Sequence, residues 1–304
     1  MTTSGVTQTK FLKWLNGSAN NLTIKIFLDG PPIRWSVFLY LCVMKLTFLG
    51  TGTSQGVPVI GCQCEVCRSE DRRDKRLRTA AMLEVEGKRI IIDAGPDFRY
   101  QMLRENVTHI EAILLTHEHK DHTGGLDDVR AFNFVDYPII HTTHIYANEP
   151  TIASIRHDFH YAFAQDKYRG VPEIELHTIE ESTPFVVSGI EITPIVGRHS
   201  ERFRSTGFRF GELAYITDMN HIDAREIEKL KGVRVLVINA LRWEPHSSHF
   251  SVDEALQIIN QVSPERAFLT HMSHRIGLHR EASARLPKGV ELAYDGLTID
   301  INEQ

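Results

Sequence analysis

Cysteine is scarce in this chain. Only four cysteines occur in 304 residues, and three of them fall within the six-residue segment Cys62–Cys67. A fold held together by disulfides would distribute its cysteines along the chain, so this arrangement argues against a disulfide framework. Three clustered thiols instead indicate metal ligands in a reducing compartment, and we therefore expect a cytoplasmic protein.

A long hydrophobic run is also missing. The apolar segment 35–43 has nine residues, too few to cross a bilayer, and no small-residue cleavage site of a signal peptide follows it. We expect no membrane partner. We interpret residues 1–43 as a leader or poorly ordered extension, with a membrane or partner anchor as the alternative. Met44 opens a credible first strand, so the predicted domain covers residues 44–304.

An excess of positive charge is absent as well. The formal net charge is −5, which gives no support to a nucleic-acid groove, because such a groove needs a basic field. We therefore expect no nucleic-acid partner. A small anionic substrate stays compatible with this charge, since a bound dication can dominate the local field.

From Met44 onward, apolar strands alternate with loops and then with helices, which predicts an α/β fold. We expect strands at 45–50, 80–86, 89–93, 112–116, 144–147, 190–196, 206–210, 213–217, 234–239 and 266–270. We expect helices at 97–104, 124–132, 150–162, 222–231 and 251–261, the last beginning with a capping box of Ser251 and Glu254. Residues 133–180 are the least regular part, interpreted as a surface connection with its own helix or as an insertion over a site.

A dense group of metal-ligand side chains follows the apolar segment Ala112–Leu115. The group consists of His117, His119, Asp121 and His122. In an extended chain His117 and His119 point to the same side, so both imidazoles can reach one cation. Asp121 and His122 are then placed to serve a second cation nearby. Imidazole with carboxylate is the ligand set expected for zinc, manganese or iron.

Three later predicted strands also end in a ligand. His199 follows strand 190–196, Asp218 ends strand 213–217, and His271 follows strand 266–270. Catalytic groups commonly lie where a rigid strand meets a loop. The chain therefore contains enough ligands for two metal sites.

These motifs resemble the metallo-β-lactamase superfamily, whose His-x-His-x-Asp-His signature is matched by His117–His122. The resemblance runs from about Lys45 to Ile301 and implies an αββα sandwich, with two mixed sheets covered by helices. It implies one metal at His117, His119 and His199, a second metal at Asp121, His122 and His271, and Asp218 as the bridge between them. It also implies that Asp93 orders the ligand loop rather than binding metal.

A narrower family fits too. The segment Gly50–Pro58, followed by Cys62-x-Cys64-x-x-Cys67, resembles the phosphoribosyl 1,2-cyclic phosphate phosphodiesterases of phosphonate (carbon–phosphorus lyase) metabolism. The segments Arg76–Arg78 and Tyr294–Gly296 also match this family. The resemblance implies a structural zinc at Cys62, Cys64, Cys67 and His274, a closed set of four suited to such a role. A redox role for Cys64 and Cys67 is the alternative, but it leaves Cys62 unexplained.

The resemblance implies a hydrolase with two divalent catalytic metals, zinc or manganese. Its substrate would be a phosphodiester, most readily a small cyclic phosphate of the phosphoribosyl or 2′,3′-cyclic nucleotide type, attacked by a hydroxide that bridges the metals. His249 matches the family position thought to act as general acid; alternatively it caps or packs near the helix start. Arg130 could pair with a substrate phosphate or could be an exposed helical arginine.

Two other functions share the same metal loop. One is a ribonuclease that processes transfer-RNA 3′ ends, and the other is a non-hydrolytic metal-binding accessory protein like those of quinone-cofactor biosynthesis. The net charge of −5 argues against the first, and the complete ligand set argues against the second. Relatives often dimerise, so a homodimer is one assembly compatible with the resemblance.

Overall fold

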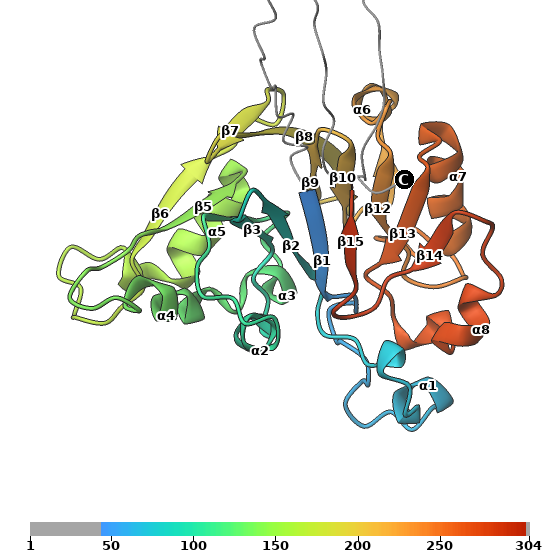
Figure 1. Ribbon diagram of the computed structural model, residues 1–304, viewed down its shortest axis with the longest axis horizontal. Coiled ribbons are helices and arrows are strands. Elements are labelled where there is room, and N and C mark those ends of the chain that lie inside the picture. The colour runs from blue at the N-terminus through green and yellow to red at the C-terminus, as the bar shows by residue number, and fades with distance from the viewer. Residues whose placement is uncertain (1–43, 302–304) are drawn as a thin grey trace, which may run out of the picture. The chain divides into compact units, whose positions relative to one another are not determined.

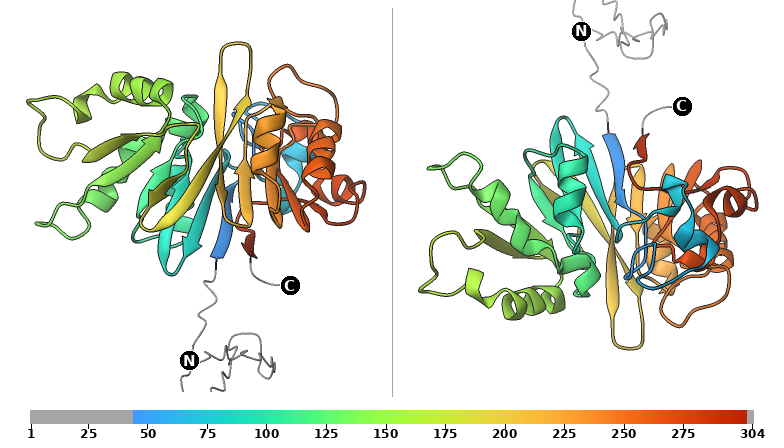
Figure 2. Two further views of the ribbon diagram at one scale, coloured as in Figure 1. Left: turned by 90° about the horizontal axis from the view of Figure 1, so that it is seen from above. Right: turned by 90° about the horizontal axis from the view of Figure 1, so that it is seen from below.

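The computed structural model describes residues 44–301, so the predicted leader lies outside the described residues. Two mixed sheets form the centre of this part of the chain, and helices lie on their outer faces (Figure 1). The views in Figure 2 show the same layering. The predicted αββα sandwich is confirmed.

The first sheet has seven strands, and the second has eight. In spatial order, the first contains β15 (Thr298–Asp300), β1 (Met44–Gly50), β2 (Ala80–Val85), β3 (Lys88–Ile92), β4 (Ala112–Leu114), β5 (Thr143–Ala147) and β6 (Ile174–Thr178). The second contains β11 (His221–Ile222), β8 (Ile190–Arg198), β9 (Arg204–Phe210), β10 (Leu213–Ile216), β12 (Val235–Asn239), β13 (Arg266–Thr270) and β14 (Val290–Leu292), and β7 (Phe185–Val187) pairs with β8.

Helices are short, and 3₁₀ turns separate several of them. The helices are α1 (Glu65–Arg68), α2 (Phe98–Arg104), α3 (Lys120–Thr123), α4 (Arg130–Asn133), α5 (Glu149–Asp158), α6 (Ala224–Lys229), α7 (Val252–Val262) and α8 (His279–Ser283). The 3₁₀ turns are Arg72–Asp74, Leu126–Val129, His160–Ala162 and His274–Ile276. None of the helices in residues 44–301 has the length and apolar character needed to cross a membrane.

The central strands of the sheets are buried on both faces, which explains their continuous apolar sequences. Along β12, Val235 and Val237 pack in the core between the sheets, whereas Leu236 and Ile238 pack outward. Those outward residues meet α6 and α7, and the outer face of the first sheet meets α2 and α5. The period of two along each strand therefore builds three apolar layers.

All ten predicted strands are confirmed, with boundaries that differ by at most two residues, but five strands were not predicted. These are β6, β7, β11, β14 and β15, of which none exceeds five residues. The interpretation of 133–180 as a surface connection was wrong in part, because β5 and β6 belong to the first sheet. Such short, partly exposed segments have little apolar periodicity, so the sequence gives a weak signal for them.

The predicted helix 124–132 was also wrong. The chain forms α3 before this range, then a 3₁₀ turn and the short helix α4. Gly124 ends α3, and a Cβ at Gly125 would lie 2.1 Å from the carbonyl oxygen of Gly95. This close approach requires glycine at position 125, which lies between the end of α3 and the 3₁₀ turn Leu126–Val129. The predicted helix 222–231 begins later, at Ala224, because Ile222 belongs to β11. The predicted helix 150–162 is α5 followed by a separate 3₁₀ turn.

Strand directions decide where the ligand-bearing loops meet. Strands β3 and β4 are parallel, and β8, β10, β12 and β13 run in one direction in the second sheet. Their carboxyl ends therefore lie at one edge of each sheet. The amide of Thr206, at the start of β9, donates to the carbonyl of Thr116 after β4 at 2.9 Å. This bond joins the two edges.

Candidate metal centre and active site

The structure brings all seven predicted ligands of the paired site together. Three overlapping groups each have ligand atoms within 4.8 Å of one another. They are His117, His119 and His199; His117, His122 and Asp218; and Asp121, His122 and His271. The first and third are the two ligand sets that the family resemblance implied.

Asp218 lies between the two sets. Its Oδ2 is 3.2 Å from His122 Nε2, and its Oδ1 is 3.0 Å from His271 Nε2. Asp121 Oδ2 is also 3.2 Å from His122 Nε2 and lies 3.8 Å from His271 Nε2. Both of these histidines belong to the second set, and Asp218 also groups with His117 of the first set, with ligand atoms within 4.8 Å, so its carboxylate adjoins both sets.

Three residues of the site have left-handed backbone conformations. Their φ angles are 65° at Asp93, 56° at Asp218 and 58° at His271. Each follows a strand of the sandwich, so the chain turns sharply where the side chain must enter the site. Asp and His are enriched among non-glycine residues at positive φ, and each such position costs on the order of 1–3 kcal/mol. Three of the seven non-glycine residues at positive φ within residues 44–301 thus lie at the predicted site.

Asp93 holds the ligand loop by hydrogen bonds. Its Oδ1 accepts from the amide of Thr116 at 2.9 Å, and its Oδ2 accepts from His122 Nδ1 at 2.7 Å. The contact with Nδ1 leaves Nε2 of His122 facing Asp121 and Asp218. The predicted ordering role of Asp93 is consistent with these contacts.

A main-chain carbonyl orients a second histidine. His199 Nδ1 donates to the carbonyl oxygen of Ser248 at 2.8 Å, so the lone pair of Nε2 points to the cluster, where it lies 3.2 Å from His119 Nδ1. Partners of this kind fix the tautomer and the ring direction of a metal-binding histidine. No sequence pattern marks Ser248, because its contribution is a backbone atom.

Burial and charge set opposite protonation states within the cluster. Burial lowers the pKa of His117 and of His199. Burial alone would raise the pKa of Asp218, but His271 and His122 hold that pKa well below its usual value. Near neutral pH, Asp218 is therefore ionised and the imidazoles of His117 and His199 are neutral, which are the forms that bind cations. Burial alone would lower the pKa of His122, but Asp218, Asp93 and Asp121 raise it well above its usual value, so a cation at His122 would displace a proton.

Several buried nitrogens of the cluster have no hydrogen-bond partner. They are Nε2 of His117, Nε2 of His122 and both ring nitrogens of His271. Buried polar atoms are normally paired, so a convergent set of unpaired nitrogens beside two carboxylates needs an explanation. Divalent cations fit this donor set, since zinc and manganese accept imidazole and carboxylate ligands.

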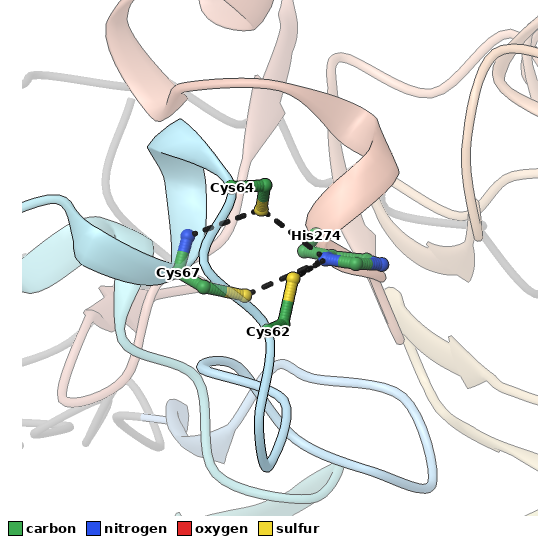
Figure 3. A group of neighbouring side chains, drawn as sticks. All are labelled: Cys62, Cys64, Cys67 and His274. Atoms are coloured by element: carbon green, nitrogen blue, oxygen red, sulfur yellow. Dashed lines mark hydrogen bonds between the residues drawn. The ribbon is translucent and has the colours of Figure 1, made fainter.

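The cysteine cluster forms a second, separate group with His274 (Figure 3). The sulfurs of Cys62, Cys64 and Cys67 lie 3.3, 3.4 and 3.4 Å from His274 Nδ1. The group joins the segment with α1 to the 3₁₀ turn after β13, and Figure 2 shows the α1 segment beside α8. The backbone amide of Cys67 lowers the pKa of Cys64 to about 6, which favours the thiolate.

Three sequence segments that carried the family resemblance meet beside this group. Asp295 accepts from Thr51 Oγ1 and from the amide of Leu77, both at 2.7 Å. The fully buried Arg76 donates to Thr51 Oγ1 at 3.1 Å and to the carbonyl oxygen of Ala293 at 2.8 Å. These bonds attach the segments on either side of the cysteines to the connection between β14 and β15. The three motifs therefore serve one structural purpose.

His249 lies against the paired site. Its Nδ1 is 3.5 Å from Asp218 Oδ1, and its ring centroid is 4.8 Å from those of His199 and His271. Burial lowers its pKa to about 3. His249 does not cap α7, because Ser251 and Glu254 supply the capping box there, as predicted.

Arg130 has a different environment. It is the first residue of α4, its side chain is about half exposed, and its Nη2 lies 3.5 Å from Asp127 Oδ2. The same Asp127 accepts a bond from Tyr161. The structure shows no contact of Arg130 with the histidine cluster, so its predicted substrate role has no support from geometry.

The loop after β8 contains residues that the sequence analysis missed. The ring of Phe203 packs on His119, with centroids 4.7 Å apart. Arg202 and Arg204 line two pockets of about 550 and 770 Å³, which also involve Glu118 and Ser200 respectively. Within residues 44–301, neither guanidinium has a hydrogen-bond or ion-pair partner. Their position three and five residues after His199 was the signal that could have identified them.

Comparison with known proteins agrees with this geometry. The model of the beta-lactamase superfamily domain matches residues 88–272. A solved structure described as a new diphosphatase from the PhnP family is 39% identical, with a TM-score of 0.78 over 85% of this chain and 97% of that chain. A ribonuclease Z of Methanopyrus kandleri is 26% identical over 85% of this chain and 98% of its own length.

A further relative differs in length. An octanoyltransferase of Porphyromonas gingivalis is 42% identical over 263 residues, which cover 86% of this chain but only 52% of the relative. The present chain thus spans about half the length of that curated relative. The superfamily match and the likeness to the diphosphatase agree with the family predicted from the cysteine motif. The chain therefore belongs to the metallo-β-lactamase superfamily and, within it, to the PhnP family.

Proposed function

We propose that this protein is a two-metal hydrolase that cleaves a phosphodiester in a small molecule, most readily a cyclic phosphate. The observation that carries the proposal is the convergence of unpaired buried histidine nitrogens on Asp218, with Asp121 and His249 beside them. We assign one cation to His117, His119 and His199 and the other to Asp121, His122 and His271. Bound divalent cations would polarise the phosphoryl group and lower the pKa of water.

The chain's own residues supply orientation. Asp93 directs Nε2 of His122 into the site, and the carbonyl of Ser248 does the same for His199. Because each ligand follows a strand of a buried sheet, the packing of the sandwich restricts its movement. A phosphodiester bound at the cluster would thus meet donors that need little rearrangement.

We assign proton transfer to His249. Burial lowers its pKa to about 3 although Asp218 lies beside it, so the ring is neutral near pH 7 before substrate binds. The negative charge of a bound phosphate favours the imidazolium form, which can then donate a proton to the leaving alkoxide. Binding of the substrate would therefore convert His249 into its acid form.

A diphosphate is the second candidate substrate. The solved relative is described as a diphosphatase, and the unpaired guanidinium groups of Arg202 and Arg204 line pockets next to the loop of His199. Arginine binds phosphate oxygens through two parallel hydrogen bonds, so these side chains could hold a second phosphate. A substrate with a single phosphate would not need them.

One panel of substrates tests the proposal. The full-length protein, loaded with zinc or manganese, is assayed with a cyclic ribose phosphate, a 2′,3′-cyclic nucleotide, a nucleoside diphosphate and transfer RNA. Cleavage of a cyclic phosphate supports the first candidate, and faster cleavage of the diphosphate replaces it with the second. Cleavage of transfer RNA alone would support the ribonuclease alternative. Absence of any hydrolysis by metal-loaded protein would contradict the hydrolase and favour an accessory role.

Elemental analysis accompanies the panel. We propose three metals per chain at the two centres described so far: two at the paired site and one structural zinc at the three cysteines and His274. The four donors surround one point (Figure 3) and make a closed set without an open position. A measured content of two metals per chain would contradict the structural zinc but not the paired site.

A further inference from the structure

A third group of potential ligands lies away from both proposed centres. It consists of His144 on β5 and Glu175 and His177 on β6, with ligand atoms within 4.8 Å of one another. His144 lies opposite Glu175 in the parallel register, and Tyr146 lies opposite His177. The alternate residues Ile145 and Leu176 pack on the other side of the sheet, in the helix-covered core. The three polar side chains therefore share one face.

The distances suit a single cation. Nδ1 of His144 and Nε2 of His177 are 3.0 Å apart. One carboxylate oxygen of Glu175 lies 3.6 Å from His144, and the other lies 3.7 Å from His177. Metal–ligand distances of about 2.0–2.1 Å allow two ligands of one ion to be at most about 4.2 Å apart. All three separations lie below this limit.

A hydrogen bond between the two rings explains only part of this arrangement. It would account for the nitrogens but not for Glu175, whose oxygens are both beyond hydrogen-bond range of the rings. The carboxylate nevertheless presents one oxygen to each imidazole. A cation between the three groups would bind all of them at once. The ring of His177 is held in place by stacking on Tyr146, with ring centroids 4.4 Å apart.

We propose that His144, Glu175 and His177 form an additional surface site for zinc or a similar divalent transition metal. Two imidazoles and one carboxylate favour such ions over magnesium and calcium, which prefer oxygen ligands. The side chains are 41%, 57% and 30% exposed, so water can fill the remaining positions. A pocket of about 440 Å³ beside His144 and Glu175 gives access from solvent.

The site would join two strands at the end of a sheet. β6 is the last strand of the first sheet and pairs only with β5 within residues 44–301. A metal held by both strands binds only the folded arrangement and therefore stabilises it by linkage. This role is independent of the proposed hydrolysis, because it involves none of the residues assigned to the paired site.

The test compares zinc content at a fixed free zinc concentration. Full-length protein is dialysed against zinc, and zinc per chain is measured for the unchanged chain, His144→Gln, His177→Gln and the control His157→Gln. His157 is also exposed, and its Nδ1 lies 3.2 Å from a carboxylate oxygen of its chain neighbour Asp158. We expect one zinc fewer per chain in the first two variants and no change in the control.

A second readout separates loss of the site from loss of folding. The full-length protein with one added equivalent of Cu²⁺, after zinc has filled the other centres, should give an electron paramagnetic resonance spectrum with two coordinated nitrogens. The His144→Gln variant should show one, with unchanged circular dichroism and hydrolytic rate. Equal zinc content in all four proteins, or a copper spectrum unaffected by His144→Gln, would overturn the proposal.

Discussion

Replacing Asp93 with asparagine tests how the paired site is organised. Asn has the same shape and tolerates the positive φ of 65°, so the backbone strain is unchanged. Its carbonyl oxygen can still accept from the amide of Thr116. Its amino group, however, would face Nδ1 of His122, where the carboxylate oxygen now accepts at 2.7 Å. The ring must then move its proton to Nε2, the atom that faces Asp121 and Asp218.

The expected effect falls on metal binding more than on the metal-free fold. Loss of a carboxylate that orients a ligand typically lowers metal affinity 10- to 100-fold, which is about 1.4–2.7 kcal/mol. In the metal-free protein, the lost charge-assisted bonds are offset in part because burial already raises the pKa of Asp93 and disfavours its charge. The thermal midpoint should therefore fall mainly in the metal-loaded protein.

Competition with a chelator measures the affinity for metal. Thermal melting with and without metal measures how much metal binding raises the thermal midpoint. Asp74→Asn is the control, because Asp74 is equally buried but bonds to the amide of His279 and to Ser69. The control should melt earlier without weakening the paired site. If Asp93→Asn kept the affinity and the metal-dependent increment of the unchanged protein, the assigned role of Asp93 would be refuted.

Four further outcomes are expected. Cys64→Ser should remove one zinc per chain, measured by elemental analysis, and leave the paired site filled; loss of all metals would contradict two separate centres. His249→Gln should lower kcat about 10²- to 10⁴-fold for alkyl esters but much less for a p-nitrophenyl ester, whose leaving group needs no proton; equal losses would exclude an acid role. Arg202→Ala should raise KM for a diphosphate more than for a cyclic phosphate, as steady-state kinetics can show. Burial raises the pKa of Asp295 from 3.8 to about 6, so the folded state retains a proton that the unfolded state has released. The free energy of unfolding should thus fall by about 3 kcal/mol as pH rises through this window, and Asp295→Asn should abolish that component in urea titrations.

Much of the fold and of the site could be predicted from local sequence. Strands such as β12 and β13 are uninterrupted apolar runs bounded by polar turns, and the capping box at Ser251 marks the start of α7. Such signals depend only on residues that are close in sequence, so they can be recognised without knowledge of the tertiary structure. The ligand loop was visible for the same reason, because four ligand-type side chains occur within His117–His122.

Other features had no local signal. Between α3 and α4, Gly125 closely approaches Gly95, thirty residues earlier in the chain. The orienting contact of Ser248 with His199 uses a backbone carbonyl and spans 49 residues. Short edge strands such as β6 have polar residues on one face, which a loop can have as well. Each of these depends on what lies opposite in space.

The sequence by itself determined the chemical inventory of this protein: imidazoles, carboxylates and thiols placed at strand ends or clustered in one loop. The tertiary structure alone decided which of them meet. Cys62 and His274 are 212 residues apart but lie 3.3 Å from each other, and Asp218 contacts both His122, which follows a strand of the first sheet, and His271, which follows a strand of the second. It also placed His144 beside His177 through the parallel pairing of β5 and β6. The physical reason is that residue type and periodicity act over a few residues, whereas a metal site depends on distances set by strand order and direction across whole sheets.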